Sequence, residues 1–239
     1  MQKLQEAHPN IVVSLTSQYR MNAPISKLSS FLFYDNKLTC GNEAVSRSCL
    51  QRCGDYSPNL ENVPEFLHPI LSENLEKSCV FLDTKSEEFG EDLKSDDSEN
   101  GGVTNRGEAR LVSMLCEHFL KGGLQSSDIG IMSAYRKQVD EIRGNLNNGL
   151  VEVNTIDSYQ GREKRVIIWS MAWTSHSNKK NELLRDERRV NVALTRAKQK
   201  LVIIGCRKSL ETIEILEKMT KLIENHVEIP RNFSLPLTL

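Results

Sequence analysis

The chain has 239 residues, of which 38% are hydrophobic and 26% charged, a composition typical of a folded protein rather than a disordered segment. Its formal net charge of −1 argues against binding nucleic acid through bulk charge, although a local basic face is still possible. No run approaches the roughly 18 apolar residues of a membrane span, and the first ten residues contain no apolar signal-peptide core.

Short apolar runs recur along the chain and predict strands. Several lack the polar alternation of half-exposed strands, which indicates strands covered on both faces. Helical patterns alternate with them; at 106–123, for example, Leu111, Leu115 and Phe119 recur at helical spacing before a glycine pair. This alternation predicts a parallel α/β sheet with right-handed crossovers. The runs are residues 11–15, 79–82, 129–132, 151–153, 166–172 and 201–204, and further helical patterns cover 135–149 and 209–226.

Two segments interrupt this alternation. Residues 41–78 contain three prolines and scattered polar residues, and we expect an irregular insertion there. Residues 85–102 are acidic, poor in apolar residues and end in a glycine pair, which predicts a mobile loop. The length of 239 residues suits one large α/β domain or one domain carrying insertions, and we expect a single domain over 1–239.

Six cysteines are spread along the chain without the spacing of a metal finger. Cys79 and Cys206 lie in strand-like runs and are predicted to be buried free thiols, as in a reducing compartment. Cys49 and Cys53 could form half of a metal site, but no second pair with a suitable spacing follows. We therefore expect no metal site in this chain.

A predicted helix rich in arginine precedes the last strand of the list. At about 100° per residue, Val190, Leu194 and Ala197 form an apolar stripe. On the same helix, Arg189 and Arg196 share a flank roughly 100° away from that stripe. Two arginines so placed could bridge acidic neighbours, or their planar guanidiniums could bind phosphate oxygens. The helical pattern alone leaves both interpretations open.

Three motifs occur in order: "LTSQYRMN" (15–22), "VNTIDSYQGREKRVIIWS" (153–170) and "RRVNVALTRAK" (188–198). Together they resemble the late motifs of superfamily 1 helicases. With "KLTCG" and "SDIGIMSAYRKQ", the chain looks most similar to the second, C-terminal motor domain of the eukaryotic replication and repair helicase–nuclease branch. The resemblance covers about residues 5–40 and 76–225. It implies a RecA-like, P-loop NTPase-type sheet with helices on both faces, lacking the half that carries the P-loop.

The resemblance also implies residue roles at an ATP site between two motor domains. Tyr19 would stack on the adenine, and Gln18 belongs to the same nucleotide-binding motif. Arg20 would reach the γ-phosphate, and Arg196 would be the arginine finger that stabilises charge developing on the γ-phosphoryl group. Arg189 would support the phosphate site or pair with a nearby carboxylate.

The middle motif adds three nucleotide-binding residues by resemblance. Gln160 would orient groups at the cleft, Gly161 would permit a tight turn, and Glu163 would accept hydrogen bonds from the ribose hydroxyls. The ends of parallel strands are where α/β sheets place ligands, which suits the assignment of Glu163.

A nucleic-acid path is implied by the same motifs. Thr155, at the end of a predicted strand, would hydrogen-bond a phosphate of the bound single strand. Tyr135 or Arg136 would line the path through stacking or phosphate contact. The partner would be single-stranded DNA, although these motifs do not distinguish DNA from RNA.

No G-x-x-x-x-G-K-[ST] phosphate loop occurs in the sequence, and the paired acidic residues that hold Mg²⁺ are not recognisable. We therefore expect ATP with Mg²⁺ to be shared with a first motor domain, supplied in cis or in trans, and the isolated chain to be inactive. The resemblance implies a 5′-to-3′ DNA helicase of the nucleus, with the mitochondrion as a second location. Two alternatives stay open: a non-catalytic docking module, and the equivalent half of an RNA helicase.

Overall fold

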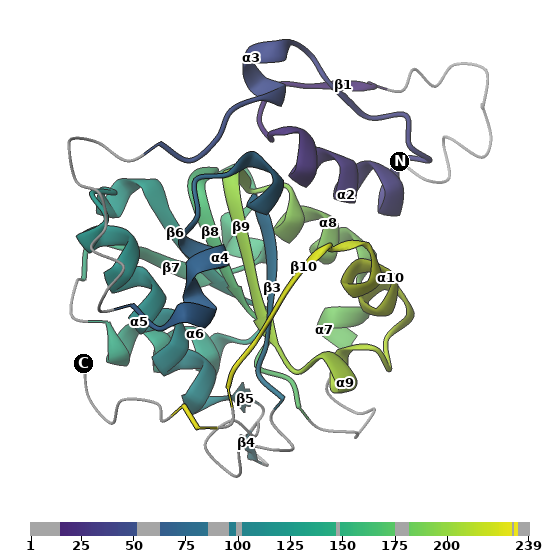
Figure 1. Cartoon of the computed structure of the whole chain (residues 1–239). Coiled ribbons are helices and arrows are strands. Elements are labelled where there is room, and N and C mark those ends of the chain that lie inside the picture. The colour runs from purple at the N-terminus through teal and green to yellow at the C-terminus, as the bar shows by residue number, and fades with distance from the viewer. Residues whose placement is uncertain are drawn as a thin grey trace.

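The computed structural model describes residues 15–51, 63–85, 96–98, 102–146, 149–174, 182–230 and 232–233. Its main sheet has six parallel strands in the order β10-β3-β9-β8-β6-β7 (Figure 1). The predicted parallel α/β sheet is thus confirmed, and the strand predicted at 11–15 lies outside the described residues except for its last position. The strands are β3 (Cys79–Asp83), β6 (Ile129–Ser133), β7 (Glu152–Thr155), β8 (Lys164–Ser170), β9 (Ala197–Gly205) and β10 (Asn225–Glu228).

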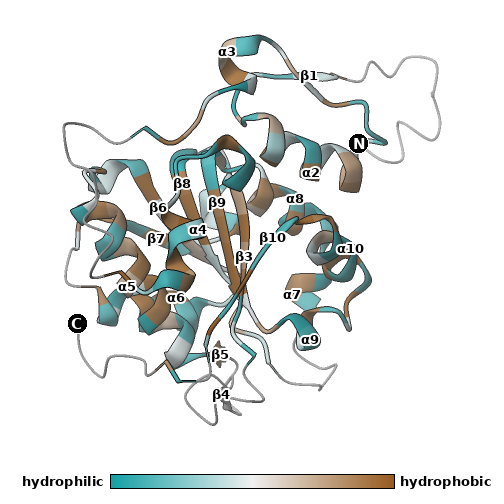
Figure 2. Cartoon of the chain, viewed as in Figure 1, coloured by the Kyte–Doolittle hydropathy of each residue, from teal (hydrophilic) through white to brown (hydrophobic). Residues whose placement is uncertain are grey.

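Helices cover both faces of this sheet. Alternate residues of β3 show the two faces: Val80 and Leu82 belong to one buried apolar cluster, whereas Phe81 belongs to the other. The apolar strands lie between the two helical layers in Figure 2. This is the RecA-like arrangement that the sequence predicts. The first face carries α4 (His68–Leu71), α5 (Arg106–Lys121) and α6 (Arg136–Asn145), and the second carries α2 (Ala23–Phe33), α7 (Glu182–Arg185), α8 (Glu187–Leu194) and α10 (Glu214–Leu222).

A small N-terminal layer lies beyond the amino ends of the central strands, at the top of Figure 1. In it, β1 (Ser17–Gln18) pairs in parallel with β2 (Thr39–Cys40), and α2 and α3 (Glu43–Ser46) flank them. Asn22 attaches this layer to the sheet. Its fully buried side-chain amide donates to Ser48 O (3.0 Å), Ser78 Oγ (2.8 Å) and Gln199 O (3.0 Å), and its oxygen caps α2.

The two interrupting segments are only partly described. Within 41–78, the described residues form several short helical elements after β2, and they bury Leu50, Leu67 and Ile70 against the sheet. Within 85–102, β4 (Asp96–Ser98) pairs antiparallel with β5 (Gly102–Thr104). The mobility of that segment stays a prediction. The remaining elements are α9 (Arg207–Leu210) and the 3₁₀ helices η3 (Glu65–Leu67), η4 (Leu75–Lys77), η6 (Ser126–Asp128) and η7 (Asp157–Tyr159).

A buried polar network joins the amino-terminal turns of α5 and α6 to the end of β8. Glu108 is fully buried, and its Oε2 accepts hydrogen bonds from Ser170 Oγ (2.7 Å) and Ala172 N (2.9 Å). Gln138 donates to the same Ser170 Oγ (3.0 Å) and accepts from Asn105 N (2.7 Å). Burial raises the pKa of Glu108 to about 7, although its hydrogen bonds act in the opposite direction.

This network makes stability depend on pH. Since the folded-state pKa of Glu108 lies above its ordinary value of 4.5, the folded chain retains the proton to higher pH than the unfolded chain. The contribution of Glu108 to the free energy of unfolding should therefore fall by roughly 3 kcal/mol as the pH rises through that interval. Glu108→Gln keeps an acceptor oxygen but cannot titrate, so its profile should be flatter. Urea unfolding between pH 4.5 and 8 checks this, and parallel wild-type and variant profiles would contradict it.

Candidate functional site

The three motifs meet at the amino ends of β8 and β9. Arg20 follows β1, Glu163 directly precedes β8, and Arg196 and Lys198 stand at the start of β9. Glu163 therefore lies at the amino end of a strand and not at a carboxyl end, where parallel α/β sheets commonly place ligands. The reason is the connection from β7 through η7, which returns across the sheet and brings the motif to the amino end of β8, beside the N-terminal layer.

The turn after β1 is built by the side chain of Gln18. Its Oε1 accepts hydrogen bonds from the backbone N–H groups of Arg20 and Met21, both at 2.8 Å. Its Nε2 donates to Met21 O (2.8 Å) and Cys40 Sγ (3.2 Å). Gln18 therefore shapes the turn that presents Tyr19 and Arg20, and a direct contact of Gln18 with nucleotide stays a prediction.

Tyr19 projects from this turn with 67% of its surface exposed. Its hydroxyl makes no hydrogen bond with any residue in the described ranges. Large aromatic side chains are mostly buried, because exposing them sacrifices apolar burial. An exposed ring beside cationic side chains is suited to stacking on a flat base.

Arg20 and Lys198 share one carboxylate. Arg20 Nε lies 2.5 Å from Glu163 Oε2, and Lys198 Nζ lies 2.7 Å from Glu163 Oε1. Arg20 Nη1 also donates to Thr195 O at 3.1 Å. Lys198 and then Arg20 hold the pKa of the Glu163 carboxyl below its ordinary value. Glu163 thus fixes both cations, and each of its oxygens keeps a further lone pair for a donor such as a hydroxyl.

Arg196 is the most buried cation of the group, with 8% exposure. Its guanidinium donates to Val192 O (2.9 Å), Thr195 Oγ1 (2.8 Å) and Arg162 O (3.3 Å). It makes no ion pair with the residues that the structure describes. Burial, and then the neighbouring charge of Arg20, lower its pKa. A buried guanidinium with only neutral partners is costly, and its charge is left for an anion.

The shared helical flank predicted for Arg189 and Arg196 is wrong, because α8 ends at Leu194. Thr195 N still donates to Asn191 O (3.1 Å), but Arg196 Nε takes Val192 O (2.9 Å), the carbonyl that Arg196 N would bond in a continuing helix. Of the two roles predicted for Arg189, carboxylate pairing is confirmed: its Nε lies 2.9 Å from Asp157 Oδ1, and a second pair joins it to Asp186.

The tight turn predicted at Gly161 is present. Gly161 has φ +84°, Gln160 before it is extended, and Arg162 N donates to Tyr159 O at 3.0 Å. This turn type needs a positive φ at its third position, which only glycine adopts without strain. Gln160 is exposed at the turn, and its role in orienting groups stays a prediction.

The residues predicted to contact nucleic acid lie at the other end of the sheet. Thr155 ends β7, and its Oγ1 is 3.0 Å from Ser158 Oγ. Tyr135 is 5% exposed within an apolar cluster, so the prediction that it stacks on a base is wrong. Arg136 is exposed at the first turn of α6 and stays a predicted contact. The sequence motif does not distinguish the two positions. Where β6 turns into α6, the side chain of Tyr135 is buried and that of Arg136 is exposed.

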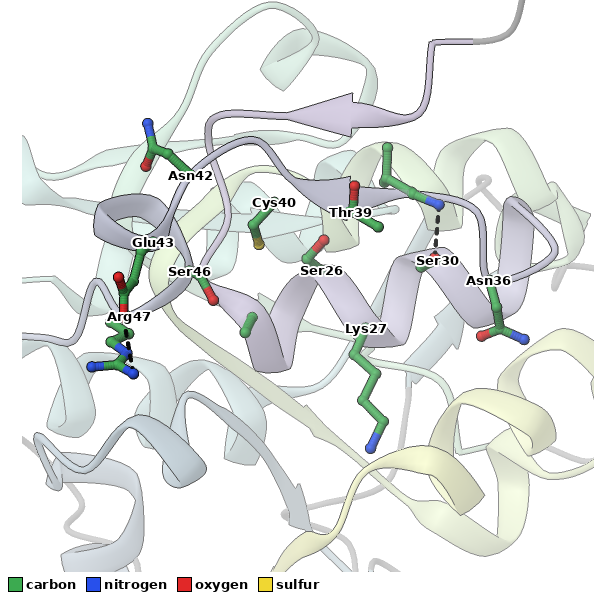
Figure 3. Close-up of a pocket in the computed structure, with 12 residues that line it drawn as sticks. Ser26, Lys27, Ser30, Asn36, Thr39, Cys40, Asn42, Glu43, Ser46 and Arg47 are labelled. Atoms are coloured by element: carbon green, nitrogen blue, oxygen red, sulfur yellow. Dashed lines mark hydrogen bonds and ion pairs between the residues drawn. The ribbon is translucent and has the colours of Figure 1, made fainter.

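Two residues of the site escaped the sequence analysis. Lys198 had a detectable signal, since it lies two positions after Arg196 at the start of β9 and strand residues two apart share a face. Gly41 ends the quoted segment "KLTCG", but that segment does not show its contact with Tyr19, because the two residues follow separate strands, β2 and β1. Cys40 and Asn42, on either side of Gly41, line a hollow of about 640 Å³ between α2, β2 and α3 (Figure 3). None of the predicted site residues lines that hollow.

Metal and membrane features are limited in the described ranges. No group of three or more His, Cys, Asp or Glu side chains is arranged to hold a metal ion among those residues. Cys79 and Cys206 are buried free thiols, as predicted, and Cys53 lies outside the described residues. Within the same ranges, none of the helices has the length and apolarity needed to cross a bilayer.

The chemistry of this site fits a nucleoside triphosphate. Three cations surround a single carboxylate: Arg20, Lys198 and Arg196 against Glu163. The excess positive charge suits phosphate oxygens, and the ring of Tyr19 suits a base. Because both oxygens of Glu163 are bound by cations, the site provides no carboxylate set for Mg²⁺.

Comparisons with known proteins agree on one family. A family model described as "AAA domain" matches residues 1–208. The DNA replication ATP-dependent helicase/nuclease DNA2 of Homo sapiens is 40% identical over 224 residues, covering 91% of this chain and 21% of that protein. The Bos taurus protein of that name is 39% identical with the same coverage. The Saccharomyces cerevisiae protein is 37% identical, covering 92% of this chain and 14% of its own length. The chain thus spans about a fifth or less of these relatives.

Proposed function

The chain belongs to the AAA domain family, and we propose on that basis that it is the second RecA-like motor domain of an ATP-dependent 5′-to-3′ DNA helicase. The observation that carries the proposal is the buried Arg196, which lies beside Arg20 and makes no ion pair within the described residues. A buried guanidinium without an ion pair can stabilise an anion that enters the site. Relatives that are 39–40% identical to the chain carry the name of a replication helicase/nuclease, which supports the same proposal.

Each side chain of the site has a separate task in this proposal. Tyr19 stacks on the base, and Glu163 accepts a hydrogen bond from the ribose while it orients Arg20 and Lys198. Arg20 and Lys198 donate to phosphate oxygens, and Arg196 stabilises the negative charge that develops on the transferred phosphoryl group. Bound ATP with Mg²⁺ supplies the phosphoanhydride bond to be cleaved.

The first motor domain would supply what this chain lacks. Neither a P-loop nor the acidic ligands of Mg²⁺ are recognisable in the sequence. The chain alone therefore has no cradle for the triphosphate and should not hydrolyse ATP. Joined to a P-loop domain, in cis or in trans, its cationic group would face the terminal phosphate across the cleft.

Single-stranded DNA is the proposed second ligand. Thr155 ends β7 and Arg136 follows the carboxyl end of the neighbouring β6, since Thr155 pairs in register with Ser133, three positions before Arg136. A hydroxyl and a guanidinium at one edge suit successive phosphates. The nucleotide residues lie at the amino ends of the strands, so binding of single-stranded DNA and hydrolysis of ATP would use opposite ends of the sheet. A replication function places the protein in the nucleus, with the mitochondrion as a second proposed location.

Strand unwinding tests the proposed substrate and polarity. The chain is joined to a P-loop motor domain, and ATP-dependent unwinding is measured on matched DNA and RNA duplexes with a 5′ or a 3′ tail. We expect unwinding of DNA with a 5′ tail. Equal or better unwinding of RNA would favour the RNA helicase alternative. Binding of single strands without ATP-dependent unwinding on any substrate would favour the docking module.

A further inference from the structure

Gly41 lies directly beneath the ring of Tyr19. It follows β2, and its N–H donates to Gln18 O at 2.8 Å, which fixes it beside the turn that carries Tyr19. A Cβ atom at position 41 would stand 2.2 Å from Tyr19 Cζ, 2.3 Å from Cε1 and 2.8 Å from Cδ1. The tyrosine ring therefore occupies the volume that any other side chain at position 41 would fill.

The backbone at position 41 does not itself require glycine. Gly41 lies outside the left-handed region, whereas Gly161 has φ +84°. Its neighbours Cys40 and Asn42 line the hollow beside α2 (Figure 3), whereas Gly41 is not among the residues that line it. Space for the Tyr19 ring is therefore the physical reason for glycine at this position.

Tyr19 has little other support. Two-thirds of its surface is exposed, and its hydroxyl has no hydrogen-bond partner in the described part of the chain. Its ring is also absent from the aromatic contacts among those residues. Contact with the flat backbone of Gly41 thus leaves the rest of the ring open to a ligand.

We infer that Gly41 is a positioning residue for base recognition: its bare backbone seats the Tyr19 ring in the orientation that stacks on the base of a nucleotide. This inference rests on the proposed function and adds a specificity determinant to it. A methyl group at position 41 displaces an exposed ring that is free to rotate away, so the substitution should disturb stacking rather than the fold. Stacking of one base on an aromatic side chain corresponds to roughly a fivefold to hundredfold change in affinity.

A double-mutant cycle on the full motor, with this chain joined to a P-loop motor domain, tests the inference. Steady-state ATP hydrolysis is measured for Gly41→Ala, Tyr19→Ala and the double variant. Gly144→Ala is the matched control, since a Cβ there meets no atom within 4 Å. We expect Gly41→Ala and Tyr19→Ala each to raise the KM for ATP about tenfold with kcat nearly unchanged. In the Tyr19→Ala background, Gly41→Ala should add nothing, because the ring it displaces is gone.

Inorganic triphosphate separates base recognition from phosphate binding. Because it has no base, its inhibition constant should be the same for wild type and all variants. An unchanged KM in Gly41→Ala, or a Gly41→Ala effect of the same size without the Tyr19 ring, would overturn the inference and leave the proposed function standing. If Gly41→Ala unfolds the protein, as far-ultraviolet circular dichroism would reveal, the inference is also overturned. If the joined wild-type motor neither binds nor hydrolyses ATP, the proposed function fails and the inference fails with it.

Discussion

Replacing Arg196 with alanine should lower ATP turnover of the joined two-domain motor by roughly 10³- to 10⁵-fold, the range for arginine fingers in related phosphoryl-transfer systems. The buried guanidinium is held by hydrogen bonds to three neutral acceptors, Val192 O, Thr195 Oγ1 and Arg162 O. The cation is thus oriented before the nucleotide binds, as electrostatic catalysis requires. Binding of single-stranded DNA should stay at the wild-type level, because the predicted DNA contacts lie at the carboxyl ends of the strands and Arg196 lies at the amino ends. Steady-state turnover and fluorescence-anisotropy binding measure the two quantities.

Two variants define the specificity of this result. Arg188→Ala removes an exposed arginine from α8, and its turnover should remain near wild type. Arg196→Lys keeps the charge but loses the planar fork that makes three hydrogen bonds, so its turnover should also be strongly reduced. Near-normal turnover of Arg196→Ala would exclude Arg196 as the finger.

Replacing Asn22 with alanine should lower the free energy of unfolding of the chain by about 3 kcal/mol. The substitution removes three hydrogen bonds from a fully buried amide and leaves Ser48 O, Ser78 Oγ and Gln199 O without that donor. It also removes the cap of α2. Because these bonds attach the N-terminal layer to the sheet, the turn that carries Tyr19 should loosen as well. Urea unfolding of the 239-residue chain gives the free energy.

Asn42→Ala is the matched control for this prediction. Asn42 also caps a helix, since its side chain accepts from Val45 N at 2.9 Å, but it is exposed and, within the described residues, its side chain makes no hydrogen bond to the main sheet. Its loss should cost about 0.5–1 kcal/mol. Similar costs for the two substitutions would mean that Asn22 acts only as a cap.

The sheet could be predicted from the sequence because strand burial is a local pattern. Runs such as 79–82 and 201–204 are apolar without alternation, and the structure buries them between two helical layers. The order of the strands and the position of the N-terminal layer were not accessible in this way, since they depend on pairing between distant residues. Asn22, for example, bonds to residues up to 177 positions away.

The candidate site was predictable only in part, for a similar reason. Motif resemblance named Arg20, Glu163 and Arg196, but the contact between Arg20 and Glu163 spans 143 positions and has no local signature. The helical wheel failed at Arg196 because it assumed that α8 continues past Leu194, whereas the helix ends there and the Arg196 side chain takes the carbonyl of Val192. A place for Tyr135 or Arg136 on the strand path was inferred from the resemblance of the segment 133–138, and that resemblance does not show that Tyr135 is only 5% exposed.

The central claim is that this chain carries half of an ATP site. It is tested most directly by measuring ATP hydrolysis, with and without single-stranded DNA, for the chain alone, for a P-loop motor domain alone and for the two joined. We predict negligible turnover for each part alone and DNA-stimulated turnover for the joined protein. Turnover by the chain alone at the rate of the joined protein, or a joined protein no faster than the P-loop domain by itself, would contradict the claim.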